Sequence, residues 1–510
     1  MSAPRKAMTQ TGEHRSRSGS VGEPGSRRSV GERGPRRRSA QRPSQRARVA
    51  DPARDLAFGV LRAVADGAYA NLELPARIRR AGLSGRDAAF ATELCYGTLR
   101  MQGFYDGVVS AAADRPAARI DPPVLDVLRL GCHQLLGMRV PDHAAVSATV
   151  ALARQGVGAG AAGFVNAVLR RVSEVDLRDW TARLADSVTD DLDRVALLHS
   201  HPPWVARALR AALIANQATT TAQAGDDLAE LLAAHNTPGQ VTLVARPGLG
   251  AEAELRDAGA RPDPVAGTAW RLPGGDPGAL QSVRRGGAAV QDAGSQLVAL
   301  ALLAAPVDGD AGTWLDLCAG PGGKAGLLAA AAAPLGARLR ANEVSPHRAE
   351  LVRHTLAAAA AAGADVEVTV ADGREIGRTD PGRYDRVLVD VPCTGLGALR
   401  RRPEARWRRK PSDLTELGPL QRDLLASAVG ATNPGGVVVY ATCSPHLAET
   451  HFVVRDTIDR RDDVALEDIR PLLTDRNGAQ LPHTGPGPWA QLWPHRHDTD
   501  GMFVALLRKR

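Results

Sequence analysis

The sequence predicts a protein of several domains, in which an all-α bundle precedes an α/β domain built on a mainly parallel sheet. Three observations carry this prediction. The chain has 510 residues, more than one hydrophobic core usually supports. Between residues 51 and 180 the apolar residues recur at helical spacing. From residue 291 onward, apolar runs alternate with amphipathic stretches, which is typical of strands and helices that alternate along a parallel sheet.

Changes in composition divide the chain into five segments. Residues 1–50 are predicted to be a disordered basic tail, because they hold 13 Lys and Arg against 3 Asp and Glu and almost no large apolar side chain. Residues 51–180 form the helical bundle, and residues 181–235 form a helical connector. Short apolar runs with Gly and Pro turns predict a small β-rich piece at 236–290, and the α/β domain spans 291–510.

The positive charge of the chain is concentrated in the tail. The whole chain carries a net charge of +8 and residues 1–50 carry +10, which leaves −2 for the rest. An Arg-rich arm suits non-specific contact with phosphates through counterion release. A solvated extension without any ligand is equally compatible with the pattern.

Several classes of protein are not supported. No uninterrupted apolar run could span a bilayer and no apolar segment follows the basic N-terminus, so we expect a soluble, cytoplasmic protein without a membrane partner. The 13 histidines include no HExxH pair, and no metal is predicted. The five cysteines are far apart and never form a CxxC pair, which favours neither disulfides nor a zinc site. They are Cys95, Cys132, Cys318, Cys393 and Cys443.

Five apolar runs in the α/β domain are predicted strands of the sheet, and a later pair resembles an antiparallel hairpin at its edge. The five are Thr313–Leu317, Ala337–Val344, Val366–Ala371, Arg386–Val391 and Val437–Thr442, and the pair is Ala490–Leu492 with Met502–Leu507.

A glycine-rich turn follows the first of these strands. Residues 315–324 read Leu-Asp-Leu-Cys-Ala-Gly-Pro-Gly-Gly-Lys, at the place where a ligand meets the carboxyl end of a sheet. The turn is not a P-loop, because Cys318 and Ala325 stand where that motif needs Gly and Ser or Thr. Glu343 ends the next strand, where a carboxylate can bind ribose hydroxyls, and Asp372 ends the third, beside a possible adenine edge. A tight turn with solvated acids is the alternative, but three features in order favour a ligand site. The predicted ligand-binding residues are Cys318, Ala319, Gly320, Pro321, Gly322, Gly323, Lys324, Glu343, Asp372 and Asp390.

Two further strands each end in a cysteine. Residues 390–393 read Asp-Val-Pro-Cys and residues 441–444 read Ala-Thr-Cys-Ser, so both thiols are expected on the ligand side of the sheet. A buried structural cysteine is the usual alternative, and we accept it for Cys95 and Cys132. For the two strand-end cysteines, neighbouring Pro and polar residues argue against a core role.

These motifs carry a resemblance to a known family. Residues 316–324, 343–348, 390–397, 442–444 and 500–503 are similar, in this order, to the motif series of the Nop2/Sun family of RNA cytosine-C5 methyltransferases, over about 220 residues. Paired PC and TC cysteines distinguish these RNA enzymes from the DNA type. The resemblance implies a Rossmann-like fold, S-adenosyl-L-methionine as cofactor, and RNA rather than DNA as partner. We expect a monomer, but the sequence does not fix the oligomeric state.

The resemblance also implies a division of labour between the cysteines. C5 of cytosine is not nucleophilic until a group adds at C6, and a thiolate supplies that addition. By resemblance Cys443 attacks, while Cys393 helps to release the product. An acid near N3 would aid the first step and a second proton-transfer group the last, and Asp390 and Lys324 complete the set of candidate catalytic residues. Val391 and Glu449-Thr450-His451 depart from the family pattern, but both motif cores are intact.

The helical segment carries a second resemblance. Residues 86–87 with 93–100, then 130–135 and 163–171, are similar to the NusB-like RNA-binding domain. A NusB-like domain fused before a Sun-type domain is the arrangement of bacterial 16S rRNA methyltransferases, which implies 16S rRNA or a small-subunit precursor as partner. Residues 236–290 would then be the RRM-like piece found in such enzymes. An enzyme acting on another RNA, such as tRNA, and a non-catalytic NusB-type protein with a degenerate second half are the alternatives.

A basic run follows the Cys393 loop. Residues 400–402 are three arginines, and residues 406–410 read Arg-Trp-Arg-Arg-Lys. Cations beside an aromatic ring can grip phosphates and stack a base. A solvated charge run is the alternative, but adjacency to the catalytic loop favours RNA. The candidate RNA contacts are Arg348, Arg401, Arg406, Trp407 and Arg408.

Overall fold

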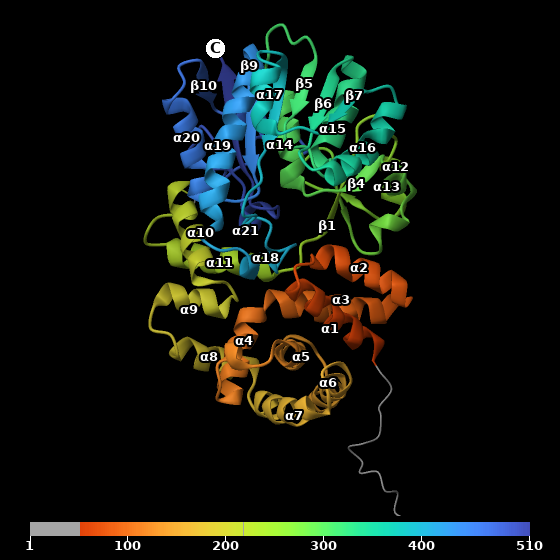
Figure 1. The fold of residues 1–510 in the computed structure, drawn as a ribbon, viewed down its shortest axis with the longest axis vertical. Coiled ribbons are helices and arrows are strands. Elements are labelled where there is room, and N and C mark those ends of the chain that lie inside the picture. Colours follow the sequence, from red (N-terminus) through yellow and green to blue (C-terminus); the bar gives the residue numbers. More distant parts are fainter. Residues whose placement is uncertain (1–50, 218) are drawn as a thin grey trace, which may run out of the picture. The chain divides into compact units, whose positions relative to one another are not determined.

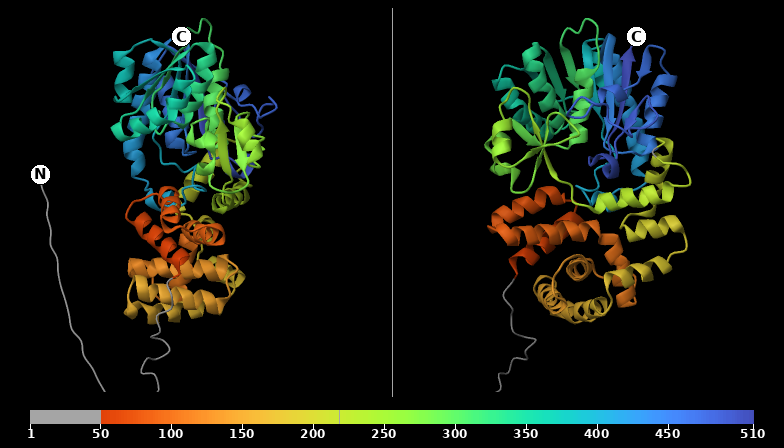
Figure 2. Two further views of the ribbon diagram at one scale, coloured as in Figure 1. Left: turned by 90° about the vertical axis from the view of Figure 1, so that its right-hand side faces the viewer. Right: turned by 180° about the vertical axis from the view of Figure 1, so that it is seen from behind.

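A computed structural model describes residues 51–217 and 219–510 of the chain, so the predicted basic tail lies outside the described residues. Figure 1 shows a helical bundle and an α/β domain, and Figure 2 gives two further directions of view. The predicted combination of an all-α N-terminal part and an α/β part is confirmed. In the described part of the chain, no helix is long and apolar enough to cross a membrane.

The N-terminal bundle begins with a capped helix. The Asp51 side chain accepts a hydrogen bond from Arg54 N at 3.2 Å, and Pro52 occupies the first turn, where its missing N–H costs nothing. Apolar side chains from all the helices fill one core. The helices are α1 (Pro52–Ala65), α2 (Ala70–Ala81), α3 (Gly85–Arg100), α4 (Gln102–Ala113), α5 (Pro122–Cys132), α6 (Asp142–Gly156) and α7 (Ala159–Ser173).

Four helices form the connector. The apolar residues of the last three make a separate small core that also includes Leu396, Leu399 and Trp493 of the α/β domain, whereas Trp180 and Leu184 of the first helix join the core of the bundle. The connector therefore packs directly beneath the loops of that domain. Its helices are α8 (Leu177–Asp186), α9 (Asp191–Leu198), α10 (Pro203–Ala215) and α11 (Ala224–Asn236).

A small antiparallel sheet follows the connector, with strand order β2-β3-β1-β4. Trp270 and Leu243 lie in the core between the sheet and its helices. The elements are β1 (Val241–Ala245), α12 (Glu252–Asp257), β2 (Arg261–Pro262), β3 (Ala269–Leu272), α13 (Gln281–Arg284) and β4 (Ala288–Val290).

The large sheet has the order β10-β12-β9-β8-β5-β6-β7, with β11 paired to β12. The run from β9 to β7 is parallel, whereas β12 is antiparallel to both β9 and β10. Its strands are β5 (Thr313–Asp316), β6 (Arg338–Asn342), β7 (Asp365–Thr369), β8 (Tyr384–Asp390), β9 (Thr432–Thr442), β10 (Val464–Glu467), β11 (Ala490–Gln491) and β12 (Phe503–Lys509).

The predicted edge hairpin is corrected by this order. β11 and β12 do pair antiparallel, but β12 lies inside the sheet between β9 and β10. The strand at this edge is β10, which the sequence pattern did not reveal because it is short and half-buried.

Helices cover both faces of the large sheet, so its strands read as continuous apolar runs. Within β9, Val437 and Val439 join one apolar cluster, while Val438 and Tyr440 join another on the opposite face. Because β6 and β8 leave β5 on opposite sides, the turn after β5 lies where the strand order reverses, the place where open α/β sheets bind ligands. The helices are α14 (Ala293–Ala304), α15 (Gly323–Ala332), α16 (Pro346–Ala361), α17 (Gly373–Thr379), α18 (Ala405–Arg408), α19 (Asp413–Ala431), α20 (His451–Asp459) and α21 (Pro494–His497).

Candidate active site

The glycine-rich turn after β5 lies against the end of β6. Gly320 N donates to Glu343 Oε2 at 3.2 Å, and a Cβ at Gly320 would lie 2.1 Å from that oxygen. Glu343 is 3% exposed, and its other oxygen accepts from Ser345 N at 2.9 Å. Gly322 has φ +108° and faces Thr355, so only glycine fits at either position. The turn is thus held by backbone donors around one buried carboxylate.

Arg348, a predicted RNA contact, lies at this turn. Its guanidinium is 3.4 Å from Glu343 Oε2 and also donates to Gly320 O. The side chain is 48% exposed, so its outer edge faces solvent.

The ends of β5, β6 and β7 are joined by a buried amide. Asn342 Nδ2 donates to Leu317 O at 3.1 Å and to Ala371 O at 3.0 Å. Asp372 follows directly and caps α17 by accepting from Arg374 N at 3.0 Å, while its carboxylate pairs with the Arg374 guanidinium at 2.6 Å. Asp372 therefore lies at the predicted strand end, engaged with Arg374.

A lysine and two carboxyls meet where β5 and β8 end. Lys324 Nζ donates to Asp390 Oδ2 at 2.7 Å. Burial alone would lower the pKa of Lys324, but the attraction of Asp390 outweighs it and raises that pKa. Burial, with repulsion from Asp390, raises the pKa of Asp316 to about 7. Near neutral pH the site therefore holds one firm ion pair and one carboxyl poised to exchange its proton.

The two strand-end cysteines face each other. Cys393 Sγ and Cys443 Sγ lie 3.4 Å apart, because β8 and β9 are parallel neighbours that end side by side. Donation from the Cys393 thiol lowers the pKa of Cys443, against the effect of burial, and the Lys324 charge acts in the same direction. The same contact raises the pKa of Cys393. Cys443 is thus the sulfur that more readily becomes a thiolate, the reactive form.

A buried glutamate, which the sequence reasoning did not select, holds the loop that carries Cys393. Glu449 Oε1 accepts from Thr394 N at 2.7 Å and from Gln421 Nε2 at 3.1 Å, and its Oε2 accepts from the Thr394 hydroxyl at 2.5 Å. Gln421 also donates to Pro392 O at 2.8 Å. Arg409 donates to Thr394 O at 3.1 Å and to Cys393 O at 3.4 Å. The Cys393 loop is therefore fixed on two sides.

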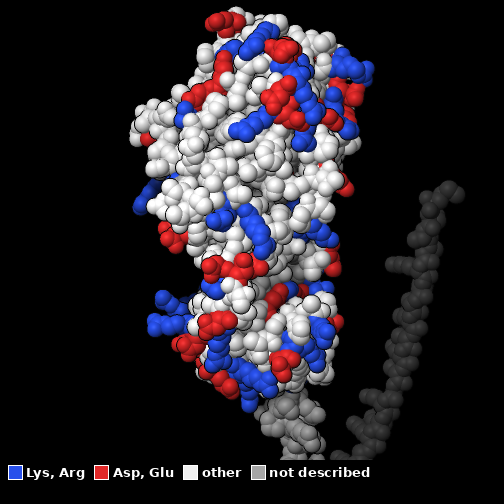
Figure 3. Space-filling view, turned by 90° about the vertical axis from the view of Figure 1, so that its left-hand side faces the viewer, with Lys and Arg blue, Asp and Glu red and all other residues white. Residues whose placement is uncertain are grey.

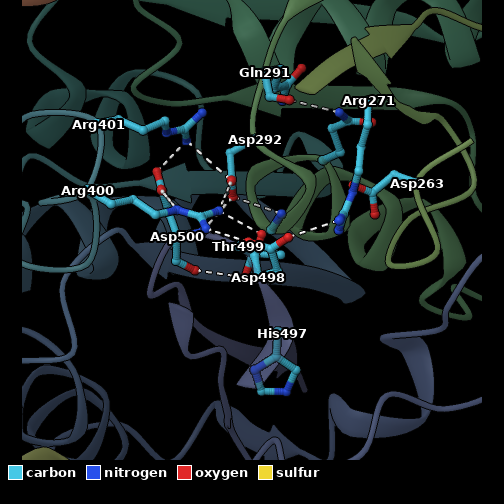
Figure 4. A network of polar contacts seen from close by, with 12 residues as sticks. Asp263, Arg271, Gln291, Asp292, Arg400, Arg401, His497, Asp498, Thr499 and Asp500 are labelled. Atoms are coloured by element: carbon cyan, nitrogen blue, oxygen red, sulfur yellow. Dashed lines mark hydrogen bonds and ion pairs between the residues drawn. The ribbon is translucent and has the colours of Figure 1, made fainter. Parts of the chain in front are cut away.

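An arginine and aspartate network lies beside the cysteines, and Figure 4 shows it from close by. Arg401 pairs with Asp500 and lies 3.5 Å from Asp292, which caps α14. Arg400 bonds Asp498 at 2.7 Å. Arg401 is still 32% exposed, so part of this predicted RNA contact faces solvent.

The prediction of an RNA contact is corrected for Arg406. Its side chain is fully buried and donates to Arg100 O at 3.1 Å, Ser200 O at 3.0 Å and Asn236 Oδ1 at 2.7 Å. Here it cannot reach a phosphate, and it instead joins α18 to the helical bundle and the connector.

The two residues after Arg406 also contact the helical bundle. Trp407 packs on Gly103, where a Cβ would lie 2.3 Å from the ring. Arg408 donates to Ala68 O at 2.7 Å, and its guanidinium stacks over the Tyr69 ring at 5.0 Å. Part of the surface of both side chains, Trp407 and Arg408, therefore contacts the helical bundle.

The fold and this site define a class of protein. The sheet is parallel except for an antiparallel strand, β12, beside β9. A glycine-rich turn lies where the strand order reverses, and a buried acid lies at the end of β6. These are the features of an S-adenosylmethionine-dependent methyltransferase.

Comparison with known proteins gives the family within this class. The family model described as 16S rRNA methyltransferase RsmB/F matches residues 301–508, and that of the NusB family matches residues 51–174. A putative methyltransferase of Mycobacterium tuberculosis is 52% identical over 91% of this chain and 98% of its own length. Ribosomal RNA small subunit methyltransferase B of Sodalis glossinidius is 32% identical over 84% of this chain and 92% of its own.

A solved structure agrees in fold. The crystal structure of the protein PH0851 superposes with a TM-score of 0.72 at 20% identity, over 91% of this chain and 99% of that one. The chain belongs to the RsmB/F family of Sun-type RNA methyltransferases with an N-terminal NusB-like domain, and S-adenosylmethionine is its cofactor.

Proposed function

We propose that the chain methylates C5 of a cytosine in RNA, with 16S rRNA as the substrate, through a covalent bond between Cys443 and C6 of the base. The 3.4 Å approach of Cys393 Sγ to Cys443 Sγ carries this proposal, because methyl transfer to an already nucleophilic atom needs no such pair. Family membership argues against a non-catalytic RNA-binding protein. A cytosine in tRNA would be methylated by the same chemistry and is the alternative substrate.

The residues have distinct roles in the proposed reaction. The Cys443 thiolate adds to C6, and the new S–C bond moves electron density to C5 while N3 gains a proton from the Lys324 and Asp390 pair. The bound cofactor supplies an electrophilic methyl group, which C5 takes up. Loss of the C5 proton to a base then expels the Cys443 thiolate, and N3 returns its proton to the Lys324 and Asp390 pair. Cys393 assists this release.

We also propose the cofactor contacts and the remaining RNA contacts. Residues 318–324 surround the methionine part of the cofactor, and Glu343 and Asp372 hold the ribose and the adenine edge. Arg348 and Arg401 keep exposed edges that can contact RNA phosphates. The antiparallel sheet at 241–290, with two helices between its strands, supports an RRM-like interpretation of this piece.

Two cysteine variants test the mechanism. Cys443→Ala removes the nucleophile, so it should neither methylate RNA nor form an adduct. Cys393→Ala leaves the attack possible but slows release, so it should accumulate an RNA–protein complex that survives denaturing electrophoresis.

The double variant Cys393→Ala/Cys443→Ala is the matched control and should trap nothing. Trapping by Cys443→Ala together with none by Cys393→Ala would reverse the two roles.

A further inference from the structure

A small pocket in the helical part of the chain takes no part in the proposed reaction. It has a volume of about 200 Å³ and lies where α3, α4 and the turn after α5 meet the connector. Pockets for drug-sized ligands measure about 300 to 1,000 Å³, so this one has room for a group the size of a single base.

An arginine with one unpaired buried donor lines this pocket. Arg100 is 7% exposed, its Nε has no hydrogen-bond partner in the described part of the chain, and its guanidinium packs on the Tyr96 ring at 5.4 Å. Leaving a buried cationic donor unbonded is costly. The pocket therefore offers a buried guanidinium to a ligand that brings acceptor atoms.

A carboxylate and an imidazole share the pocket with Arg100. Glu93 Oε1 lies 3.5 Å from His133 Nε2, and the Glu93 side chain is 50% exposed. The contact with His133 outweighs partial burial and lowers the pKa of Glu93, with help from Arg100. An ionised acceptor at the rim disfavours a simple anion and favours a ligand that carries donors beside its acceptors.

The shape of the pocket is built by glycines and aromatic rings. Tyr105 Oη and His133 Nδ1 are 2.8 Å apart, and a Cβ at Gly97 or Gly137 would lie 2.0 Å or 2.5 Å from the imidazole. The absence of a side chain at these two glycines leaves the space that the imidazole occupies. Phe104 adds an apolar wall, which suits a flat ring.

We propose that this pocket binds one unpaired guanine base of the RNA substrate. Arg100 donates to guanine O6 and N7, which is the commonest base-specific contact of arginine, while Glu93 accepts from N1–H and N2–H. Glu93 and Arg100 lie seven residues apart on one helix face, so both reach the same ligand. Adenine carries an amino group where guanine carries O6, and its donors would face the Arg100 donors.

The position of the pocket links it to the catalytic loop. Arg100 O accepts from Arg406 Nη1, and Asn236, which lines the pocket, accepts from the same nitrogen. A base held here would therefore lie beside the segment that continues from the Cys393 loop. The proposal rests on RNA being the substrate but not on C5 chemistry.

Equilibrium dialysis with the full chain tests the proposal, with S-adenosylhomocysteine present so that the cofactor site is filled. The probes are GMP, AMP and inorganic phosphate. We expect GMP to bind at least fivefold more tightly than AMP, the lower end of the discrimination that one bidentate base contact gives, and phosphate not to compete.

Glu93→Gln and Arg100→Met should each weaken GMP binding by at least fivefold, whereas Arg154→Met, at an exposed arginine of α6, should leave it unchanged. Cys443→Ala should bind GMP normally, so a failure of the C5 mechanism is distinguishable from a failure of this site. The proposal is overturned if GMP does not bind, if AMP binds as tightly as GMP, or if inorganic phosphate displaces GMP. Full GMP binding by both pocket variants would overturn it as well.

Discussion

At the scale of single residues, the site contains two carboxyl groups, Asp316 and Asp390, with different surroundings. Asp316 is 1% exposed and its Oδ1 has no hydrogen-bond partner within the described residues. Burial raises its pKa from 3.8 to about 7. Asp390, only one strand away, instead accepts from Lys324. The strand ends thus place a carboxyl that holds its proton at mildly acid pH beside a second carboxyl that is bonded to a lysine.

This difference predicts a pH dependence of stability. The folded chain binds the Asp316 proton more tightly than the unfolded chain, so its contribution is fully present below pH 3.8 and is lost as pH rises to about 7. Asp316→Asn should remove this loss, worth at most about 4 kcal/mol at about 1.4 kcal/mol per pKa unit.

Urea unfolding of both proteins without cofactor, at several pH values between 4 and 7.5, measures the effect. Parallel curves for Asp316→Asn and the unchanged chain would show that folding does not raise the pKa of this carboxyl.

At the scale of elements, α18 and its flanks connect the catalytic loop to the helical bundle. Arg409 bonds the Cys393 loop, and Arg406 bonds backbone carbonyls of α3 and of the loop before α10. Glu404 adds a contact by accepting from Ala70 N at 3.4 Å. Short as it is, this segment fixes the Cys393 loop against a separate core.

Arg406→Met should therefore destabilise the protein and impair catalysis together. It leaves several buried acceptors without a donor, and we expect a loss of about 2 to 4 kcal/mol in the free energy of unfolding, with a lower kcat and unchanged cofactor affinity.

Arg207→Met, at an exposed arginine of α10, is the matched control and should change stability by less than about 0.5 kcal/mol. Urea unfolding and single-turnover methylation measure both effects. Equal behaviour of the two variants would contradict a joining role for Arg406.

The elements that could be predicted from the sequence are those marked by a pattern of neighbouring residues. Apolar runs that end in Asp390 or Thr442 identify strand ends, and parallel neighbours bring such ends together. The burial of Arg406 was not predictable, because a basic run has the same composition whether it is solvated or inserted between domains. The role of Glu449 was hidden for another reason, since it contacts Thr394 from 55 residues away.

At the scale of the whole molecule, charge is divided unevenly. Residues 51–510 sum to −2, and Figure 3 shows basic and acidic side chains intermingled on the face that it views. Because the net charge of the folded part is slightly negative, that part provides little long-range electrostatic attraction to RNA. Recognition by the folded part must then depend on specific contacts, with any diffuse attraction supplied by residues 1–50.

Deleting residues 1–50 should weaken RNA binding at low salt without changing the chemistry. Each phosphate that the shortened chain no longer neutralises reduces the slope of log K against log salt by about 0.7 to 0.9, and cofactor affinity should stay the same. Filter binding across a salt series measures this slope. A truncated chain without turnover at saturating RNA would mean that the tail does more than add charge.

In the proposed reaction the methyl group arrives at C5 of cytosine after a thiolate adds at C6. RNA transcribed with tritium at every cytosine C5 tests this claim, because only replacement at C5 releases that hydrogen to water. We expect about one tritium released for each methyl group transferred from S-adenosylmethionine, and no release by Cys443→Ala. Methyl transfer without tritium release would place the methyl group on another atom and rule out methylation at C5.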